Sequence, residues 1–417
     1  MQSSYALHNS SPQERFSPRY GTPLTATTSS PSTPKILLYS HDTTGLGNIR
    51  RTLLLSETLQ RQYPQSTILI VTGSPMIHAF RIPDGIDYIK LPCLDRVEAD
   101  RYEPRYLSAC ATEVKQTRKT ILTNVVLGFQ PDLMIVDKRP SGIDGELLET
   151  LRALRRRRSS TKLVLGVRDI LDEPERTRTS LQKTHFFETI REYYDEVWIY
   201  GSKDIFNAVS EYRFPLDIVR KTRFCGYLKR PTVASERKSG PPRVLVTTGG
   251  GGDGSEMIEA YLEGLIALPR RFALQTTVIF GPQMPAHQRK AILDRFGYLA
   301  DVTFLDFEAD LTRHYAEADV VVSMAGYNTV CELLSFGRRA VLVPRAEPVR
   351  EQLIRARLLA KRDYFTLVEP HELNATTLMS AVLTAIGKGA SVETPVDMEG
   401  LPRIHDRARA LLAGSDR

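Results

Sequence analysis

A run of four glycines lies in Thr247–Ser255 (TTGGGGDGS), directly after a short apolar run. Gly249, Gly251 and Gly254 match the spacing GxGxxG of dinucleotide sites, but the next apolar run ends in Phe-Gly-Pro and lacks the acidic residue that completes such a site. A P-loop is excluded as well, because Ser255 stands where that motif needs lysine. The glycines favour a backbone cradle whose free N–H groups hold a phosphate or approach a substrate closely.

A second loop begins at Ser323 and reads SMAGYNTVCELL, a buried strand followed by a small-residue turn and a helix. Free N–H groups at the helix start, near Gly326, favour phosphate binding. Glu332 lies one turn further along and can accept hydrogen bonds from vicinal hydroxyls such as a ribose diol. Alternatively, Glu332 only complements the helix dipole.

Two further loops carry polar groups after expected strands. The loop Val343–Gln352 contains the cations Arg345 and Arg350, followed by Glu351 and Gln352 as polar recognition groups. The loop SHDTTGLGN near the start of the chain brings two glycines together with two titratable residues. Its residues of interest are His41, Asp42, Gly45, Gly47 and Asn48.

All four loops follow apolar runs that alternate with helical patterns. The runs are dense in Val, Ile and Leu, as strands buried on both faces are, and this alternation predicts parallel sheets covered by helices. Expected strands of the first half are Ile36–Tyr39, Thr67–Val71, Tyr88–Leu91, Leu133–Val136, Leu163–Val167 and Val197–Tyr200. Those of the second half are Val244–Thr247, Thr277–Phe280, Val302–Leu305, Val320–Ser323, Ala340–Val343 and Thr366–Val368. Ligands of such sheets bind at the carboxyl ends of the strands, where these loops lie.

The chain of 417 residues is too long for one ordinary domain, and its composition changes at two places. Residues 1–34 are rich in Ser, Thr and Pro and are expected to be a disordered tail. Residues 35–228 and 243–400 are expected to form two α/β domains, joined by a Pro- and Gly-containing linker over 229–242. The final segment, 401–417, is helical in pattern, and we expect it to pack back on the first domain.

Charge and cysteine usage narrow the class of protein. The formal net charge of +7 fits an anionic ligand or a membrane surface, whereas Arg155–Arg158 end an expected helix, so nucleic-acid binding is not predicted. The four cysteines show no metal or disulfide spacing, which favours a reducing, cytoplasmic compartment and predicts no metal site. Neither a signal peptide nor a transmembrane segment is expected.

The second half of the chain resembles the donor domain of the MurG-like family of nucleotide-sugar glycosyltransferases (family 28). The resemblance rests on Gly249–Gly254, on Ala325–Glu332 and on Arg350–Gln352, and it is strongest over residues 243–365. The segment SMAGYNTVCELLSFGRRAVLVPR is its most specific part. The resemblance implies the GT-B fold, in which two Rossmann-like, doubly wound domains face each other across a cleft.

The resemblance also implies residue roles. The donor is a nucleotide diphosphate sugar, expected to be UDP-linked and acting as co-substrate, with no cofactor and no metal. The resemblance implies that Glu332 binds the ribose hydroxyls of the donor and that Glu351 and Gln352 bind its sugar. It also implies that the backbone near Phe307 contacts the nucleobase. The cleft opposite the donor is lined by Gly250 and Gly251. Backbone contacts to the diphosphate fall to Gly326, Tyr327, Asn328 and Thr329.

One position departs from the family. The family commonly places a histidine, proposed as base or acceptor contact, at the end of the first glycine loop, where this chain has Asn48. Asparagine has no titratable group near neutrality, so another residue must act as the base or activity is reduced or absent. The candidates are His41, Asp42 and Asp137.

The predicted function is therefore an inverting, metal-independent transfer of a hexosyl group, including N-acetylhexosaminyl, to an acceptor hydroxyl. Two alternatives stay open: a sugar-nucleotide epimerase of the same fold, and a non-catalytic nucleotide-sugar-binding partner subunit. The acceptor is unknown. If first-domain cations such as Lys138, Arg139, Arg168 and Arg176 face the cleft, the acceptor is expected to be anionic or lipid-linked, with peripheral contact to the inner membrane surface.

Overall fold

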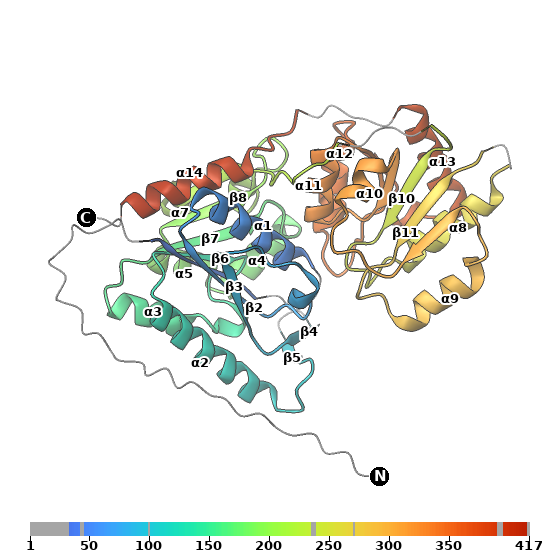
Figure 1. Cartoon of the computed structure of the whole chain (residues 1–417). Coiled ribbons are helices and arrows are strands. Elements are labelled where there is room, and N and C mark those ends of the chain that lie inside the picture. The colour runs from blue at the N-terminus through green and yellow to red at the C-terminus, as the bar shows by residue number, and fades with distance from the viewer. Residues whose placement is uncertain are drawn as a thin grey trace, which may run out of the picture. The chain divides into compact units, whose positions relative to one another are not determined.

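The computed structural model describes residues 33–41, 46–98, 101–234, 239–269, 272–389 and 395–414. This part of the chain contains two parallel sheets and a short antiparallel hairpin (Figure 1). The strands of the first sheet are β1 (Lys35–Ser40), β2 (Thr67–Thr72), β3 (Ile86–Lys90), β6 (Leu133–Asp137), β7 (Lys162–Arg168), β8 (Glu196–Tyr200) and β9 (Thr222–Gly226). Those of the second are β10 (Arg243–Thr247), β11 (Gln275–Ile279), β12 (Val302–Leu305), β13 (Val320–Ser323), β14 (Arg339–Leu342) and β15 (Thr366–Leu367).

The first strand of each sheet in the sequence lies near its centre, and later strands are added on both sides of it. The first has the order β3-β2-β1-β6-β7-β8-β9 and the second the order β12-β11-β10-β13-β14-β15. The order therefore reverses between β1 and β6, and again between β10 and β13, where the loops after neighbouring strands leave toward opposite faces. These switch points are where doubly wound sheets bind ligands. The prediction of two Rossmann-like, doubly wound units is confirmed.

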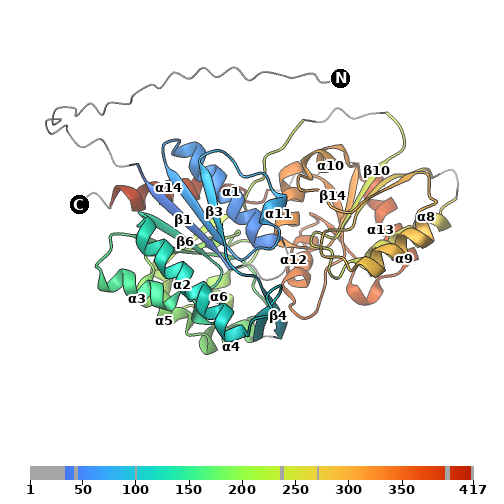
Figure 2. The ribbon, with the colours of Figure 1, turned by 60° about the horizontal axis from the view of Figure 1, so that its bottom comes forward.

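The first sheet is buried on both faces because alternate residues of β1 point to opposite sides. Ile36 and Leu38 pack in one apolar cluster with α1 and α14, whereas Leu37 and Tyr39 pack in another with α2 and α3. Figure 2 shows these helix pairs on opposite sides of the sheet. The helices following the first sheet's strands are α1 (Gly47–Gln62), α2 (Ala111–Phe129), α3 (Leu148–Arg156), α4 (Pro174–Lys183), α5 (Phe186–Tyr193), α6 (Ala208–Glu211) and α7 (Leu216–Lys221).

The second sheet repeats this arrangement. Val244 and Val246 pack with α8, α9 and α13, while Leu245 and Val321 pack with α10, α11 and α12. The second-sheet helices are α8 (Ser255–Ala267), α9 (Ala286–Phe296), α10 (Thr312–Glu317), α11 (Tyr327–Phe336), α12 (Glu351–Ala360) and α13 (Ala375–Gly387). The turns after β1, β10 and β13 thus each run from a packed strand into a packed helix.

The last helix, α14 (Gly400–Ala413), lies against α1 and β9 of the first sheet although it follows the second sheet in sequence (Figure 1). Ile404 and Ala408 are fully buried in the cluster that includes α1, and Arg407 donates hydrogen bonds to Glu196 at the start of β8. The predicted domain boundaries, the disordered tail and the linker stay predictions.

Three strands were not predicted from the sequence. The strand β9 begins with polar Thr222 and Arg223, and the hairpin of β4 (Leu94–Glu98) and β5 (Arg101–Pro104) is short and charged. Their residues do not form an apolar run, so periodicity alone could not find them. No described helix has the length and apolar character needed to cross a membrane.

A buried ion pair ties α2 to the centre of the first sheet. Arg118 donates from Nε and Nη2 to the two carboxylate oxygens of Glu146 at 2.6 and 2.8 Å, and from Nη1 to the carbonyl of Pro92 at 2.7 Å. The hydroxyl of Tyr39 in β1 donates to the same carboxylate. Arg118 is fully buried and Glu146 is 1% exposed, so each charge depends on its partner.

We expect Glu146→Gln to lower the free energy of unfolding by about 3–5 kcal/mol, because the substitution leaves the Arg118 charge buried without a counterion. Urea denaturation at pH 7 measures the loss. The matched control is Glu192→Gln, which breaks the exposed pair with Arg155 and is expected to cost less than about 1 kcal/mol. Equal losses in the two variants would contradict the account.

Candidate functional site

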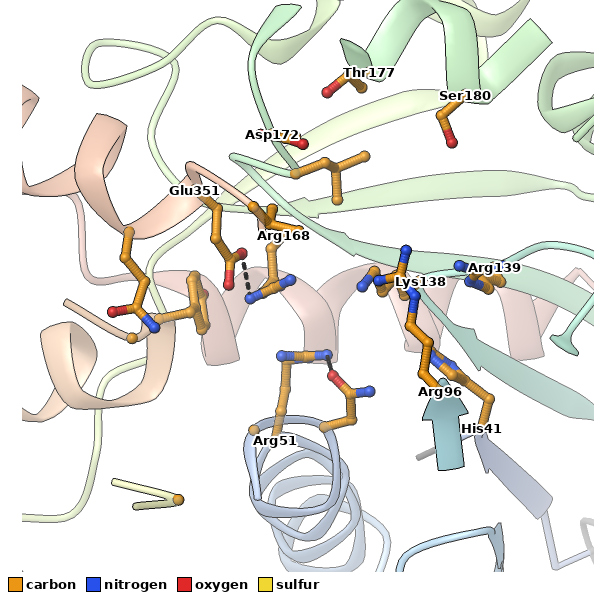
Figure 3. A pocket seen from close by; sticks show the side chains of 18 of the residues that line it. His41, Arg51, Arg96, Lys138, Arg139, Arg168, Asp172, Thr177, Ser180 and Glu351 are labelled. Carbon is orange, nitrogen blue, oxygen red and sulfur yellow. Dashed lines mark hydrogen bonds and ion pairs between the residues drawn. The ribbon is translucent and has the colours of Figure 1, made fainter. Parts of the chain in front are cut away.

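A cavity of about 1050 Å³ lies at the carboxyl ends of the central strands of both sheets (Figure 3). Its wall includes the loops that follow β1, β6 and β7 of the first sheet and β10, β13 and β14 of the second. The loops after β1, β6, β10 and β13 flank the two switch points, so the location agrees with the general rule for doubly wound sheets.

The N-terminus of α11 opens onto this cavity. Gly326 precedes the helix with extended backbone and, like Tyr327, Asn328 and Thr329, lines the cavity wall. No side chain caps the helix start, and the first N–H groups of a helix have no partner within it. The helix start therefore offers donors and a positive dipole end suited to a phosphate group.

The glycine loop after β10 lies across from this helix start. Gly251 has φ +92° and its Cα hydrogen faces the carbonyl of Phe280, which a Cβ would approach to 2.3 Å, so only glycine fits there. Gly249 has φ +69°, and a Cβ there would find only the Thr329 hydroxyl, at 4.0 Å. One glycine thus serves close packing against β11, whereas Gly249 presents bare backbone toward the N-terminus of α11.

Glu332 of α11 forms an ion pair with a residue of the first-sheet half of the chain. Its carboxylate accepts a hydrogen bond from Arg50 of α1, and its side chain is only 5% exposed. Its second oxygen, Oε2, is buried without a hydrogen-bond partner. Glu332 does not line the cavity in this arrangement, so a ribose could reach it only after Arg50 moves.

Asn328 and Arg230 extend this polar connection. The Asn328 amide donates to the carbonyl of Gly47 at 2.8 Å and accepts from Nη2 of Arg230 at 2.8 Å. Arg230 also donates to the carbonyl of Arg50 at 3.3 Å. Burial lowers the pKa of Arg230 from its ordinary value. The start of α1 and the start of α11 are therefore held together by directed hydrogen bonds.

Glu351, the first residue of α12, forms a second connection between the sheets. Its Oε2 lies 2.5 Å from Nη1 of Arg168 at the end of β7. Although burial raises the pKa of Glu351, the cations Arg168, Arg355 and Lys138 lower it to about 2. Glu351 is consequently ionised at neutral pH and can only accept hydrogen bonds from a substrate.

The three residues predicted as base candidates differ in their settings. Both oxygens of Asp137 accept hydrogen bonds from Arg51, at 2.6 and 2.8 Å between Nη2 and the carboxylate. His41 lines the cavity but is 4% exposed, and burial lowers its pKa well below the ordinary value, with Lys138 and other cations adding to the effect. Asp42 lies outside the described residues. Asn48 accepts a hydrogen bond from Arg51 at 3.0 Å.

The cavity brings together most of the residues predicted from the sequence. Those that line it are His41, Gly47, Asn48, Gly249, Gly250, Gly251, Gly326, Tyr327, Asn328, Thr329, Glu351 and Gln352. Those that do not line it are Asp137, Phe307, Ser323, Glu332 and Arg350. Gly45, like Asp42, lies outside the described residues. The roles assigned to all of these residues stay predictions.

Arg350 and Ser323 have other contacts. The Arg350 backbone N–H donates to Asp172 at 2.9 Å, and its guanidinium donates to Glu173 at 2.8 Å. The Ser323 hydroxyl is fully buried and donates to the carbonyl of Met324 at 2.8 Å. Neither residue is part of the cavity wall in this structure.

Several cations of the first-sheet half line the cavity, although none of them was among the base candidates predicted from the sequence. Lys138, Arg139 and Arg168 stand at the carboxyl ends of β6 and β7, and Arg176 lies further along the chain in α4; all four line the cavity. Lys138 follows β6 with φ +66°, a left-handed conformation that a non-glycine residue rarely adopts. We did not predict Lys138 as a candidate for chemistry. No group of three or more His, Cys, Asp or Glu side chains is placed to hold a metal among the described residues.

Comparison with known proteins agrees with this geometry. Residues 244–407 match the family model described as glycosyltransferase family 28 C-terminal domain. The UDP-N-acetylglucosamine–N-acetylmuramyl-(pentapeptide) pyrophosphoryl-undecaprenol N-acetylglucosamine transferase of Mannheimia succiniciproducens is 31% identical over 144 residues, which cover 34% of this chain and 39% of that protein. The chain spans between 37% and 47% of the length of the first curated relatives that it matches.

Solved structures share the fold over nearly the whole chain. Acinetobacter baumannii MurG superposes with a TM-score of 0.51 at 17% identity, covering 92% of this chain and 98% of that one. The UDP-GlcNAc 2-epimerase of Methanocaldococcus jannaschii gives a TM-score of 0.55 at 10% identity, covering 91% and 100%. These likenesses show the fold alone. The family match confirms the predicted resemblance over residues 244–407.

We expect Arg168→Met to lower the free energy of unfolding at pH 7 by up to about 3 kcal/mol, because Glu351 loses its nearest cation. The folded-state pKa of Glu351, about 2, lies below its ordinary value of 4.5, so the ion pair stabilises the fold fully above pH 4.5 and is lost as the pH falls toward 2. The difference between variant and wild type should therefore shrink below pH 4.5.

Urea denaturation between pH 7 and pH 3.5 measures this dependence. Arg191→Met is the control, because it removes an exposed pair with Asp217 and is expected to change stability little. A stability difference for Arg168→Met that stays constant over the whole pH range would show that Glu351 does not depend on Arg168.

Proposed function

We propose that this protein transfers a hexosyl group from a nucleotide diphosphate sugar to an acceptor hydroxyl, because residues 244–407 match the family model of the glycosyltransferase family 28 C-terminal domain. We propose a UDP-linked donor, with N-acetylhexosamine as one candidate sugar, because the curated relatives are named as UDP-N-acetylglucosamine-using transferases. The observation that carries the proposal is the uncapped start of α11, which faces the bare backbone of Gly249 across the cavity.

The donor diphosphate is proposed to bind at the start of α11. Its charge increases when the bond to the sugar breaks, so donors and a helix dipole fixed at this position stabilise the transition state more than the ground state. This electrostatic stabilisation supports a metal-independent reaction without a cofactor. In-line attack by the acceptor oxygen on the anomeric carbon inverts its configuration.

The sugar is proposed to lie near Glu351 and Gln352. Both residues are buried in the cavity wall, at 5% and 7% exposure, and their side chains can accept hydrogen bonds from sugar hydroxyls. Because Glu351 is ionised, it favours neutral sugars with hydroxyl donors at that position and disfavours sugars that place an anionic group there.

The acceptor is proposed to be anionic or lipid-linked. Arg139, Arg176 and Lys183 line the first-sheet side of the cavity, where the acceptor would enter. Arg139 has no ion pair with a described carboxylate. Its Cζ lies over the ring of Tyr102, 5.7 Å from the ring centroid. Such cations attract a negatively charged substrate. We propose a cytoplasmic protein that meets a lipid-linked acceptor at the inner membrane surface.

An epimerase remains the second candidate, because the epimerase and transferase structures match this fold about equally well. Incubation with UDP-sugars alone separates the two functions. A transferase is expected to release UDP slowly when water is the only acceptor and fast when its own acceptor is added. Conversion of the donor into an isomer would instead establish an epimerase. A partner subunit would bind UDP and turn over no donor.

We expect Glu332→Ala to weaken UDP binding by about 10–100-fold, because a hydrogen bond to a charged acceptor contributes about 1.5–3 kcal/mol. Arg50→Met should instead tighten binding, because it frees Glu332 from the competing ion pair. Isothermal titration calorimetry with UDP measures both constants. Arg61→Met on the exposed face of the same helix serves as control. Unchanged affinity in Glu332→Ala would remove Glu332 from the nucleotide site.

A further inference from the structure

We propose that Lys138 is the base that deprotonates the acceptor hydroxyl. This inference rests on the proposed glycosyl transfer and assigns its proton acceptor to a residue that lines the cavity at the end of β6. The strand β6 pairs with β1 at the switch point of the first sheet, so Lys138 lies where ligands of such sheets bind.

The backbone of Lys138 holds the residue in place. Its φ of +66° is unfavourable for a residue with a Cβ, and two hydrogen bonds fix it: the Lys138 N–H donates to Gly166 at 2.7 Å, and the N–H of Arg139 donates to the carbonyl of Asp137 at 2.8 Å. Such conformations persist where the surrounding structure enforces them, and they cluster at functional sites.

The carboxylates around Lys138 are already paired with arginines. Asp137 is held by Arg51, and Glu351 is held by Arg168. Lys138 itself has no ion pair or hydrogen bond with a described side chain. The charged and titratable groups that face it come from four elements and their following turns: Asp137 and Arg139 at the end of β6, Arg168 at the end of β7, Glu351 of α12 and His41 after β1.

Lys138 lies among cations: Arg168 and Arg139 both act on it, and Figure 3 shows all three in the cavity wall. Burial, Arg168 and Arg139 together lower the pKa of Lys138 to about 7. A base works best when its pKa lies near the working pH, because it is then available and still basic enough. His41 has a pKa well below neutrality and is a weak base, so Lys138 fits the role better.

Proton transfer to Lys138 is proposed to accompany the attack on the anomeric carbon. The neutral Nζ of Lys138 takes the proton of the acceptor hydroxyl while that oxygen forms a bond to the anomeric carbon. The bond between this carbon and the β-phosphate oxygen breaks, and its electron pair leaves with the nucleoside diphosphate. The ammonium group then returns its proton to water, and Lys138 is neutral again.

The first test compares Lys138→Arg, Lys138→Met and the exposed control Lys203→Met in the full chain. Release of UDP from UDP-sugars is measured between pH 5.5 and 9, with water as acceptor and with any hydroxyl acceptor found active. The wild type and Lys203→Met should show kcat rising through pH 7. Both Lys138 variants should lose about 10²–10⁴-fold in kcat, without that rise, while donor KM changes less than threefold.

Arginine separates two roles of Lys138, because it keeps the positive charge and cannot lose its proton. If Lys138 only attracts an anionic acceptor, Lys138→Arg keeps kcat and its pH profile, and the proposed base role is overturned. A chain that binds UDP and turns over donor, with Lys138→Arg unchanged, removes only this role. A wild-type chain that binds no UDP removes the proposed function and the base role together.

A second measurement does not depend on turnover. The rate at which 2,4-dinitrofluorobenzene modifies Lys138, followed by mass spectrometry, reports the neutral amine. The Lys138 rate should level off above about pH 7, and saturating UDP-sugar should protect Lys138 but not the exposed control Lys203. A Lys138 rate that keeps rising up to pH 10, as expected for an ordinary lysine side chain, would overturn the proposal.

Discussion

The parallel course of the strands in each sheet is the constraint on which the rest of the structure depends. Parallel strands place their carboxyl ends, and the N-termini of the helices that follow, at one edge of each sheet. The cavity is built from those edges of the two sheets, so helix dipoles and loop cations gather there. Buried carboxylates can exist in such a place only beside cations, as Asp137 beside Arg51 and Glu351 beside Arg168.

Ion pairs also join the halves of the chain. Arg50 to Glu332, Arg168 to Glu351 and Arg355 to Asp169 each connect a residue of the first-sheet half with one of the second. A nucleotide that uses Glu332 must therefore compete with Arg50. Its binding free energy is reduced by the cost of breaking that pair.

The sequence predicted the strands that are buried on both faces, because β1, β6 and β13 read as unbroken apolar runs. It also singled out four loops that line the cavity, those after β1, β10, β13 and β14, because ligands of parallel sheets bind at the carboxyl ends of the strands. It could not predict the pairing of Arg50 with Glu332, because those residues are 282 positions apart and the contact depends on tertiary packing. Lys138 was missed for a similar reason, since its low pKa arises from burial and from Arg168 on another strand.

The most direct test of the account is a crystal structure of the full chain grown with saturating UDP. The account predicts that the diphosphate lies within hydrogen-bond distance of the backbone N–H groups at Tyr327–Thr329, and that Glu332 has exchanged Arg50 for the ribose hydroxyls. A nucleotide bound away from the start of α11, or one that leaves Arg50 on Glu332 with the ribose elsewhere, would contradict it.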